Sequence, residues 1–204
     1  MTRIIRLEKT NMQAVIKEAK EALQKGGVIV YPTDTVYGLG GDATDPAIVE
    51  KIRKTKGIEE KKPFSVMMAD LAMIEEYCVV DFSEELVLKK YLPGPYTFIL
   101  KLHRPLAAST GLTLGVRIPE QNFCIQLCET FKKPIITTSA NKTGERPPRS
   151  FSDIDKEILE AADLAIDGGQ TKYEQPSVII DLVEKKVIRA GATMPAGIKD
   201  LFDL

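Results

Sequence analysis

The amino-acid sequence predicts an α/β protein: a single domain with an open, twisted mixed sheet and flanking helices. Apolar runs of strand length alternate with segments of helical periodicity along most of the chain, which is the pattern of strands covered by helices. Short links such as residues 183–185 allow antiparallel pairs, so the sheet is expected to be mixed. No internal repeat, low-complexity tract or obvious linker interrupts residues 1–204, and the core of the domain is expected over residues 10–192.

Helices are expected where apolar residues recur on one face and a cap closes the segment. The segment from Asn11 has such a face and stops at Gly26-Gly27, which is typical of a glycine C-cap. Asp45 fits the N-cap of the next helix, because Pro46 suits a first turn. The expected helices are residues 11–25, 45–57, 70–77, 83–91, 122–132 and 152–159.

Strands are expected at short apolar runs bounded by turn residues. Val28-Ile29-Val30 is such a run, since β-branched residues pack well on a pleated surface. Pro32 ends it, because proline has no N–H to give to a sheet ladder. The expected strands are residues 28–30, 64–68, 96–102, 114–118, 134–138, 164–166, 177–182 and 186–189.

Composition and charge limit the classes of function. Of the 204 residues 44% are hydrophobic and 28% charged, as in ordinary globular proteins. The net charge of −1 gives no global attraction to nucleic acid or membrane, so RNA binding would need a local patch. Residues 1–8 are charged and lack the apolar segment of a signal peptide, and nothing spans a bilayer. The odd number of three cysteines argues against a secreted disulfide framework, so a cytoplasmic protein is expected.

Metal and nucleophile motifs are not evident in the sequence. Cys124 and Cys128 are four residues apart on one expected helix face, but a zinc site needs more ligands. The single histidine, His103, lies in another segment that is expected to be exposed. Two buried core cysteines are therefore favoured, and no metal site is predicted. Neither a P-loop nor a Rossmann glycine pattern is present, and no conventional catalytic nucleophile or base is predicted.

Polar residues are concentrated directly after the first buried strand. Residues 31–40 read Tyr-Pro-Thr-Asp-Thr-Val-Tyr-Gly-Leu-Gly, with three hydroxyls and a carboxylate within five residues. The two glycines let another group approach the backbone closely. An ordinary strand exit needs fewer polar residues, so this segment indicates a ligand site, with a polar turn as the alternative.

Other strand ends also carry polar groups. Arg117 stands in an otherwise apolar strand, either exposed at its end or buried with an anionic partner. Ser139-Ala140-Asn141 follows the strand from Pro134, and either binds a polar ligand or closes a turn through its own backbone. Ligands of open α/β sheets gather outside the strand ends. We therefore expect Thr35, Arg117, Ser139, Ser177 and Arg189 to line one cavity.

A basic cluster surrounds Gly57. It is either a solvated helix face, offset by neighbouring glutamates, or an anion site for a nucleotide or RNA phosphates. Its members are Lys51, Arg53, Lys54, Lys56, Lys61 and Lys62.

Five motifs in order resemble the YrdC/YciO family, to which the threonylcarbamoyl-AMP synthases belong. The similarity covers about residues 10–192. The motifs are residues 31–40, the Pro-Gly-Pro turn at 92–97, the arginine strand at 116–119, the Ser-Ala-Asn loop at 139–141 with Gly144, and the closing strands at 177–181 and 188–191.

This resemblance implies an open α/β fold with a positively charged cavity. It also implies synthesis of threonylcarbamoyl-adenylate from L-threonine, bicarbonate and ATP, the first step in modifying a tRNA adenosine. ATP would be a substrate that carries Mg²⁺, with no tightly bound cofactor, and a downstream threonylcarbamoyl transferase would take the product. By resemblance, threonine would be held by Thr35, Arg117, Thr137 and Ser177, and the nucleotide by Lys56, Ser139, Asn141 and Arg189.

The sequence departs from the family pattern at three positions. Ile58 replaces the arginine of a Lys-x-Arg segment, Val178 stands where threonine is usual, and Pro147 where a small polar residue is common. Lys54, Lys61 or Lys62 could supply part of the missing charge. The departures leave an alternative open, a YciO-like paralogue that binds nucleotide or double-stranded RNA with weak or no synthase activity. A carbamoyl-phosphate-handling domain, as in hydrogenase maturation, is disfavoured because that context brings zinc-finger cysteines and additional domains.

Overall fold

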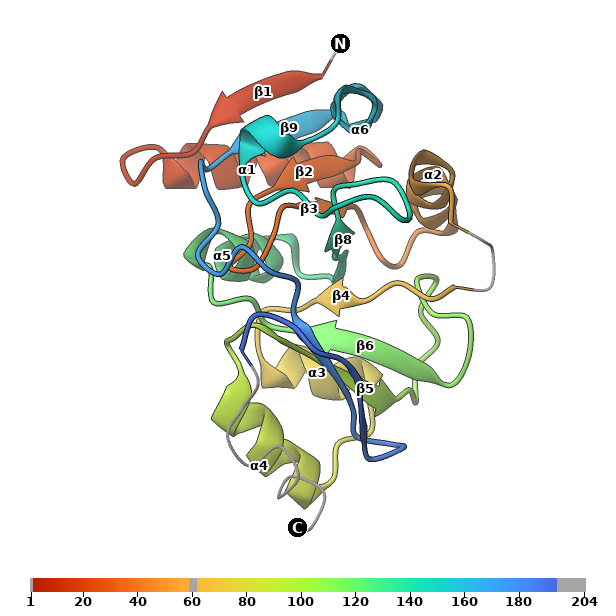
Figure 1. Cartoon of the computed structure of the whole chain (residues 1–204). Helices are drawn as coiled ribbons and strands as arrows, with labels where there is room; N and C mark the ends of the chain where they lie inside the picture. Colours follow the sequence, from red (N-terminus) through yellow and green to blue (C-terminus); the bar gives the residue numbers. More distant parts are fainter. Residues whose placement is uncertain (1, 59–61, 194–204) are drawn as a thin grey trace.

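The computed structural model describes residues 2–58 and 62–193, and its strands form two mixed sheets (Figure 1). The five-stranded sheet is parallel across β1, β9 and β2 and antiparallel across β2, β3 and β8. It has the order β1 (Arg3–Arg6), β9 (Leu164–Asp167), β2 (Ile29–Tyr31), β3 (Gly38–Gly40) and β8 (Thr138–Ser139).

The second sheet has six strands and lies on the side of the first that faces away from β1 (Figure 1). β10 and β5 run parallel, as do β4 and β6, and the other pairs are antiparallel. Its order is β11 (Lys186–Arg189), β10 (Val178–Asp181), β5 (Tyr96–Lys101), β6 (Thr113–Arg117), β4 (Val66–Met67) and β7 (Ile135–Ile136).

The predicted mixed α/β fold is confirmed, but the strands divide between two sheets where one was expected. The division falls inside the strand expected at residues 134–138. β7 pairs with β4 in one sheet, and β8 pairs with β3 in the other. Thr137 lies between them, and its N–H donates to the Ser65 carbonyl at 2.8 Å. One apolar run therefore joins both sheets.

Two strands of the first sheet were not predicted. β1 is largely exposed and reads Arg-Ile-Ile-Arg, so it lacks the apolar run that marks the other strands. β3 contains two glycines, which weaken a strand by propensity. Here they are required by close approach: a Cβ on Gly40 would lie 2.1 Å from the Ile136 carbonyl oxygen, and one on Gly38 2.8 Å from the Tyr31 ring.

The helices begin and end largely where the caps predicted. Asp45 accepts the Ala47 N–H at 2.8 Å, and Gly57 ends the same helix with a φ of 63°. The predicted helix at 152–159 is instead a 3₁₀ turn at Phe151–Asp153 followed by a separate helix, because Asp155 caps a new start. The helices are α1 (Met12–Gln24), α2 (Pro46–Lys56), α3 (Leu71–Tyr77), α4 (Phe82–Tyr91), α5 (Asn122–Phe131) and α6 (Lys156–Ala161).

Two buried apolar clusters hold these elements together. The larger contains residues of both sheets, such as Leu39 and Val116, and so fixes the sheets to each other. The smaller joins α1 to α5 and includes Cys124 and Cys128, which are fully buried as predicted. In residues 2–58 and 62–193 no helix is long and apolar enough to cross a membrane, and no His, Cys, Asp and Glu side chains cluster as metal ligands.

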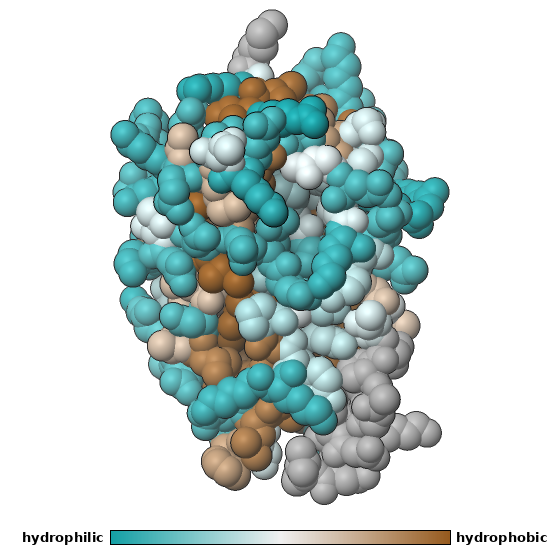
Figure 2. Space-filling view, turned by 90° about the vertical axis from the view of Figure 1, so that its left-hand side faces the viewer, coloured by the Kyte–Doolittle hydropathy of each residue, from teal (hydrophilic) through white to brown (hydrophobic). Residues whose placement is uncertain are grey.

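One face of the molecule is mostly hydrophilic, with a narrow apolar strip through its middle (Figure 2). The exposed large apolar residues include Phe82 and Leu86 on α4. Scattered apolar side chains of this kind are ordinary on protein surfaces, so we locate the functional site from the cavity that follows.

Candidate functional site

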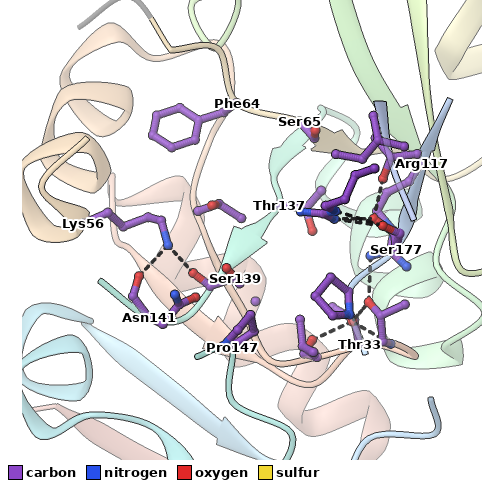
Figure 3. A pocket seen from close by; sticks show the side chains of 18 of the residues that line it. Thr33, Lys56, Phe64, Ser65, Arg117, Thr137, Ser139, Asn141, Pro147 and Ser177 are labelled. Carbon is purple, nitrogen blue, oxygen red and sulfur yellow. Dashed lines mark hydrogen bonds between the residues drawn. The ribbon is translucent and has the colours of Figure 1, made fainter. Parts of the chain in front are cut away.

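A cavity of about 280 Å³ is lined by residues from both sheets (Figure 3). The five-stranded sheet contributes Gly38 and Ser139, and the six-stranded sheet contributes Thr97 and Arg117. The predicted convergence of polar strand ends is confirmed, since every predicted site residue lines this cavity. These are Thr35, Lys56, Arg117, Thr137, Ser139, Asn141, Ser177 and Arg189.

Arg117 is buried at one end of the cavity, at the end of β6. Its Nη2 donates to Asp34 Oδ1 at 2.5 Å, and its Nη1 donates to Thr35 Oγ1 at 2.9 Å. The side chains of Arg117 and Asp34 are 6% and 0% exposed. Of the two alternatives for this arginine, burial with an anionic partner is therefore correct. The partner within the protein is Asp34, a residue to which sequence analysis gave no role.

The loop that carries Thr35 is held by its own hydroxyls. Thr33 Oγ1 donates to the Val36 carbonyl at 2.7 Å, so the 3.0 Å contact between Thr33 and Thr35 has Thr35 as its donor. The Thr35 hydroxyl therefore accepts from Arg117 and donates to Thr33. Thr171 Oγ1 donates to the Thr35 carbonyl at 2.9 Å. The Thr33 hydroxyl thus stabilises the turn, whereas the Thr35 hydroxyl bonds the turn to Arg117 in the cavity.

Ser177 and Arg189 complete this end of the cavity. Ser177 Oγ lies 2.8 Å from Thr97 Oγ1, and Arg189 Nη2 donates to the Ser177 carbonyl at 2.9 Å. Burial and the neighbouring Arg117 lower the pKa of Arg189. Because Asp34 pairs with Arg117 and no described carboxylate pairs with Arg189, this end of the cavity is positively charged.

Lys56 forms the opposite end of the cavity. It is the last residue of α2 and only 4% exposed. Its Nζ donates to the carbonyl oxygens of Ser139 and Asn141, the latter at 2.6 Å (Figure 3). Burial, and secondarily the nearby Lys62, lower the pKa of Lys56 to about 8, while Glu145 acts in the opposite direction.

The basic cluster around Gly57 has two parts. Lys56 and Lys62 line the cavity. Lys51 pairs with Asp163 at 2.8 Å, and Lys54 pairs with Glu50 at 3.6 Å, so both serve a solvated helix face. Arg53 is buried, and Lys61 lies outside the described residues. The solvated helix face is therefore correct for Lys51 and Lys54, whereas the anion site stays a prediction for Lys56 and Lys62.

The Ser-Ala-Asn loop closes a turn as well as lining the cavity. Asn141 Nδ2 donates to the carbonyls of Lys142 and Glu145 at 2.8 and 2.9 Å. Its Oδ1 is buried with no hydrogen-bond partner among the described residues. Asn141 thus fixes the backbone oxygen that receives Lys56, and Ser139 is held in β8 opposite Gly38.

Several lining residues were not predicted as site residues. Thr97, Ser65 and Phe64 line the cavity, as does Lys62, which was expected only as a member of the basic cluster. Of the three departures from the family pattern, Ile58 and Pro147 line it as well. Asp34 could have been found from its place between two threonines, because a carboxylate beside a buried strand requires a cationic partner.

The arrangement suits a ligand that is anionic at both ends. Figure 3 shows Lys56 on one side of the cavity and Arg117 on the other, with hydroxyls between them. Lys62 also lines the cavity and lies near enough to Lys56 to affect its pKa, and Arg189 is related to Arg117 in the same way. No described Asp or Glu lines the cavity. The fold and the site therefore define an α/β protein with a cationic, hydroxyl-lined cavity between two sheets.

Comparison with known proteins identifies the family. The family model Sua5_yciO_yrdC, described as "Telomere recombination", matches residues 21–191. The chain belongs to the Sua5/YciO/YrdC family. It is 32% identical over 178 residues to the threonylcarbamoyl-AMP synthase of Chromohalobacter salexigens, covering 85% of this chain and 96% of that protein.

Two solved structures share the fold. Escherichia coli YciO is 31% identical with a TM-score of 0.81, covering 94% of this chain and 95% of that one. Pyrococcus abyssi Sua5 in complex with L-threonine is 26% identical with a TM-score of 0.86, and covers 98% of this chain. The chain spans only 60% of the length of that Sua5.

Proposed function

We propose that this protein forms threonylcarbamoyl-adenylate and pyrophosphate from L-threonine, bicarbonate and ATP, the first step of a tRNA adenosine modification. The observation that carries the proposal is one cavity with cationic groups at both ends. A threonine carboxylate and a nucleotide triphosphate are two anions that must meet in one site. The names of the synthase relatives and the threonine complex of P. abyssi Sua5 support the same substrates.

The chemistry requires charge stabilisation and needs no protein nucleophile. The threonine amine adds to the carbon of bicarbonate, water leaves, and a carbamate forms. A carbamate oxygen then attacks the α-phosphorus of ATP, and the bond to pyrophosphate breaks. Negative charge accumulates on phosphoryl oxygens, so preorganised cations and hydroxyls supply most of the stabilisation.

Each end of the cavity has a role in this proposal. Arg117, already fixed by Asp34 and Thr35, pairs with the threonine carboxylate, and Thr137 and Ser177 contact the same substrate. Lys56, with Ser139, Asn141 and Arg189, surrounds the nucleotide. Because no described carboxylate lines the cavity, the residues present do not form a magnesium cage, and Mg²⁺ would come with ATP.

The same proposal includes the surroundings of the reaction. The adenylate is an activated mixed anhydride, so it would pass to a threonylcarbamoyl transferase that acts on tRNA. Contact with RNA would use a local basic patch, since the net charge of the chain is −1. The expected compartment is the cytoplasm.

The test is the substrate dependence of pyrophosphate release. Purified protein with ATP, threonine and bicarbonate should release pyrophosphate and form an adenylate whose mass includes the carbamoyl group. Omission of threonine or of bicarbonate should abolish both signals. ATP hydrolysis that is indifferent to threonine, or ATP binding without turnover, would contradict the proposal and favour a nucleotide-binding role.

A further inference from the structure

We propose that Lys62 is a phosphate-binding residue of this chain, supplying the positive charge that Ile58 does not provide. The inference rests on the proposed function, because it assigns a residue to the polyphosphate end of the same cavity. Lys62 belongs to the basic cluster around Gly57, and the members of this cluster differ in their surroundings.

The position of Lys62 is the first support. Lys62 lines the cavity together with Lys56 and Ile58. Lys62 is exposed, whereas Lys56 is buried. The two lysines are close enough for Lys62 to lower the pKa of Lys56. Among the described residues no carboxylate forms an ion pair with Lys62. Two lysines that line one cavity, with no described carboxylate in the lining, form a site for an anion.

The backbone beneath Lys62 is held by a buried arginine. Arg53 is 6% exposed, and its Nη1 donates to the Lys62 carbonyl at 2.9 Å. Its guanidinium also lies 5.1 Å from the centroid of the Phe64 ring. The Phe64 N–H donates to the Ala108 carbonyl at 3.0 Å. The base of the Lys62 side chain is therefore fixed at the cavity, while its long stem leaves the ammonium adjustable.

The other described residues of the basic cluster, and Ile58 beside it, are less suited than Lys62 to supply a second positive charge to a bound phosphate. Lys54 is 77% exposed and pairs with Glu50 along α2, and Lys51 pairs with Asp163. Neither lines the cavity. Ile58 does line it, but offers only an apolar side chain. Lys56 and Lys62 are the described lysines that line the cavity without an ion-pair partner, and of the two only Lys62 is exposed, with no hydrogen bond that holds its ammonium.

Lys56 and Lys62 together suit a polyphosphate better than a single carboxylate. An anion with several charges lying between them relieves their mutual repulsion more than a single charge does. A lysine is a point charge that accommodates different phosphate geometries, whereas an arginine fork fixes one. Lys62 would thus bind the β- and γ-phosphates less rigidly than an arginine at position 58.

The test compares Lys62→Met with Lys54→Met, which removes a similar charge from outside the cavity. Binding of MgATP, magnesium triphosphate and threonine is measured by calorimetry at one ionic strength. We expect Lys62→Met to weaken ATP and triphosphate about tenfold, at the low end for a charge-assisted hydrogen bond because the group is exposed. Threonine affinity should not change, Lys54→Met should match the wild type, and Lys62→Arg should retain ATP affinity.

The outcomes separate this inference from the proposed function. Equal ATP and triphosphate affinities in Lys62→Met and Lys54→Met would overturn the assignment of Lys62, whatever the turnover of the wild type. Polyphosphate binding that depends on Lys62, in a wild type with no threonine-dependent pyrophosphate release, would retain the assignment and overturn the synthase.

Discussion

Replacing Arg117 by methionine is expected to lower the free energy of unfolding by about 3–5 kcal/mol, because it leaves a buried carboxylate unpaired. The Asp34 side chain is 0% exposed, and Arg117 Nη2 pairs with its Oδ1. Its other oxygen, Oδ2, has no hydrogen-bond partner among the described residues. Asp34 is shielded from solvent in the intact protein, so removal of its cationic partner should be costly.

A second substitution separates stability from binding. In Arg117→Met with Asp34→Asn, the buried charge is gone, and most of the lost stability should return. Threonine binding should not return, since the guanidinium that we assign to the substrate carboxylate is still missing. That loss is expected to be ~2–4 kcal/mol. Arg117→Lys should recover little of it, because an ammonium cannot reproduce the planar fork.

The assay combines urea unfolding at pH 7 with calorimetric titration of threonine, at a temperature where all variants are folded. The expected pattern is low stability only in the single variant and weak threonine binding in both. A single variant as stable as the wild type would refute the electrostatic reasoning. A double variant with wild-type threonine affinity would refute the role assigned to Arg117.

Three further predictions concern the rest of the cavity. Lys56 has a pKa lowered from 10.5 to about 8, so kcat/KM for ATP should decline above about pH 8 as its charge is lost. The decline should move to higher pH in Lys56→Arg, and a flat profile to pH ~9.5 would contradict this. The pKa of Lys56 is lower in the folded protein, about 8, than its ordinary value of 10.5. Burial of the charged lysine therefore lowers the free energy of unfolding below pH 8, and this loss of stability disappears as the pH rises from 8 towards 10.5. Ile58→Arg should raise the rate of adenylate formation, and the activation free energy should fall by at most on the order of 3–4 kcal/mol. The increase in rate should be largest when Lys62 is also replaced by methionine. Equal rates with and without the arginine would show that the missing charge is unimportant. Gly40→Ala should destabilise the protein by about 1–3 kcal/mol, because its Cβ would lie 2.1 Å from the Ile136 carbonyl oxygen, while Gly111→Ala, with no atom within 4 Å of the added Cβ, should unfold as the wild type does.

The elements that sequence analysis predicted are those with a local signal. β2 and β5 are apolar runs with clear ends, and α2 has both an N-cap at Asp45 and a glycine at its C-terminus. β1 and β3 lack such signals, because one is exposed and the other is built on glycine. Their strand geometry comes from pairing with distant segments, which propensity does not encode.

The assignment of strands to sheets also depends on distant partners. Ile135, Ile136 and Thr138 belong to one apolar and hydroxyl run in the sequence. Their separation into β7 and β8 follows from pairing with β4 and β3, which are far apart in the chain. Nothing within residues 134–138 specifies that exchange.

The candidate site was predicted better than its internal contacts. Most of the eight residues converge on one cavity because polar groups at or near the ends of buried strands share one region of the fold, and Lys56 reaches the same cavity from the end of α2. The partner of Arg117 was not predicted, since a buried charge is satisfied by whatever the tertiary structure brings near it. Asp34 was visible in the sequence only as one of several turn residues, and its pairing across 83 positions was not.

The division into two sheets explains why the cavity lies where it does. After Ile136 the chain leaves one sheet and enters the other at Thr138, so the backbone near Thr137 cannot continue a single ladder. The sheets separate there, and polar groups from each face the gap. Lys56 is anchored to β8 and the loop after it, whereas Arg117 and Arg189 stand on strands of the other sheet. The distance between the two cationic ends is therefore set by how the sheets pack against each other. The apolar cluster that includes Leu39 and Val116 holds that distance, since it contains residues of both sheets. Positioning within a fraction of an ångström matters for phosphoryl transfer, so repacking this core can slow the reaction without altering any residue of the cavity.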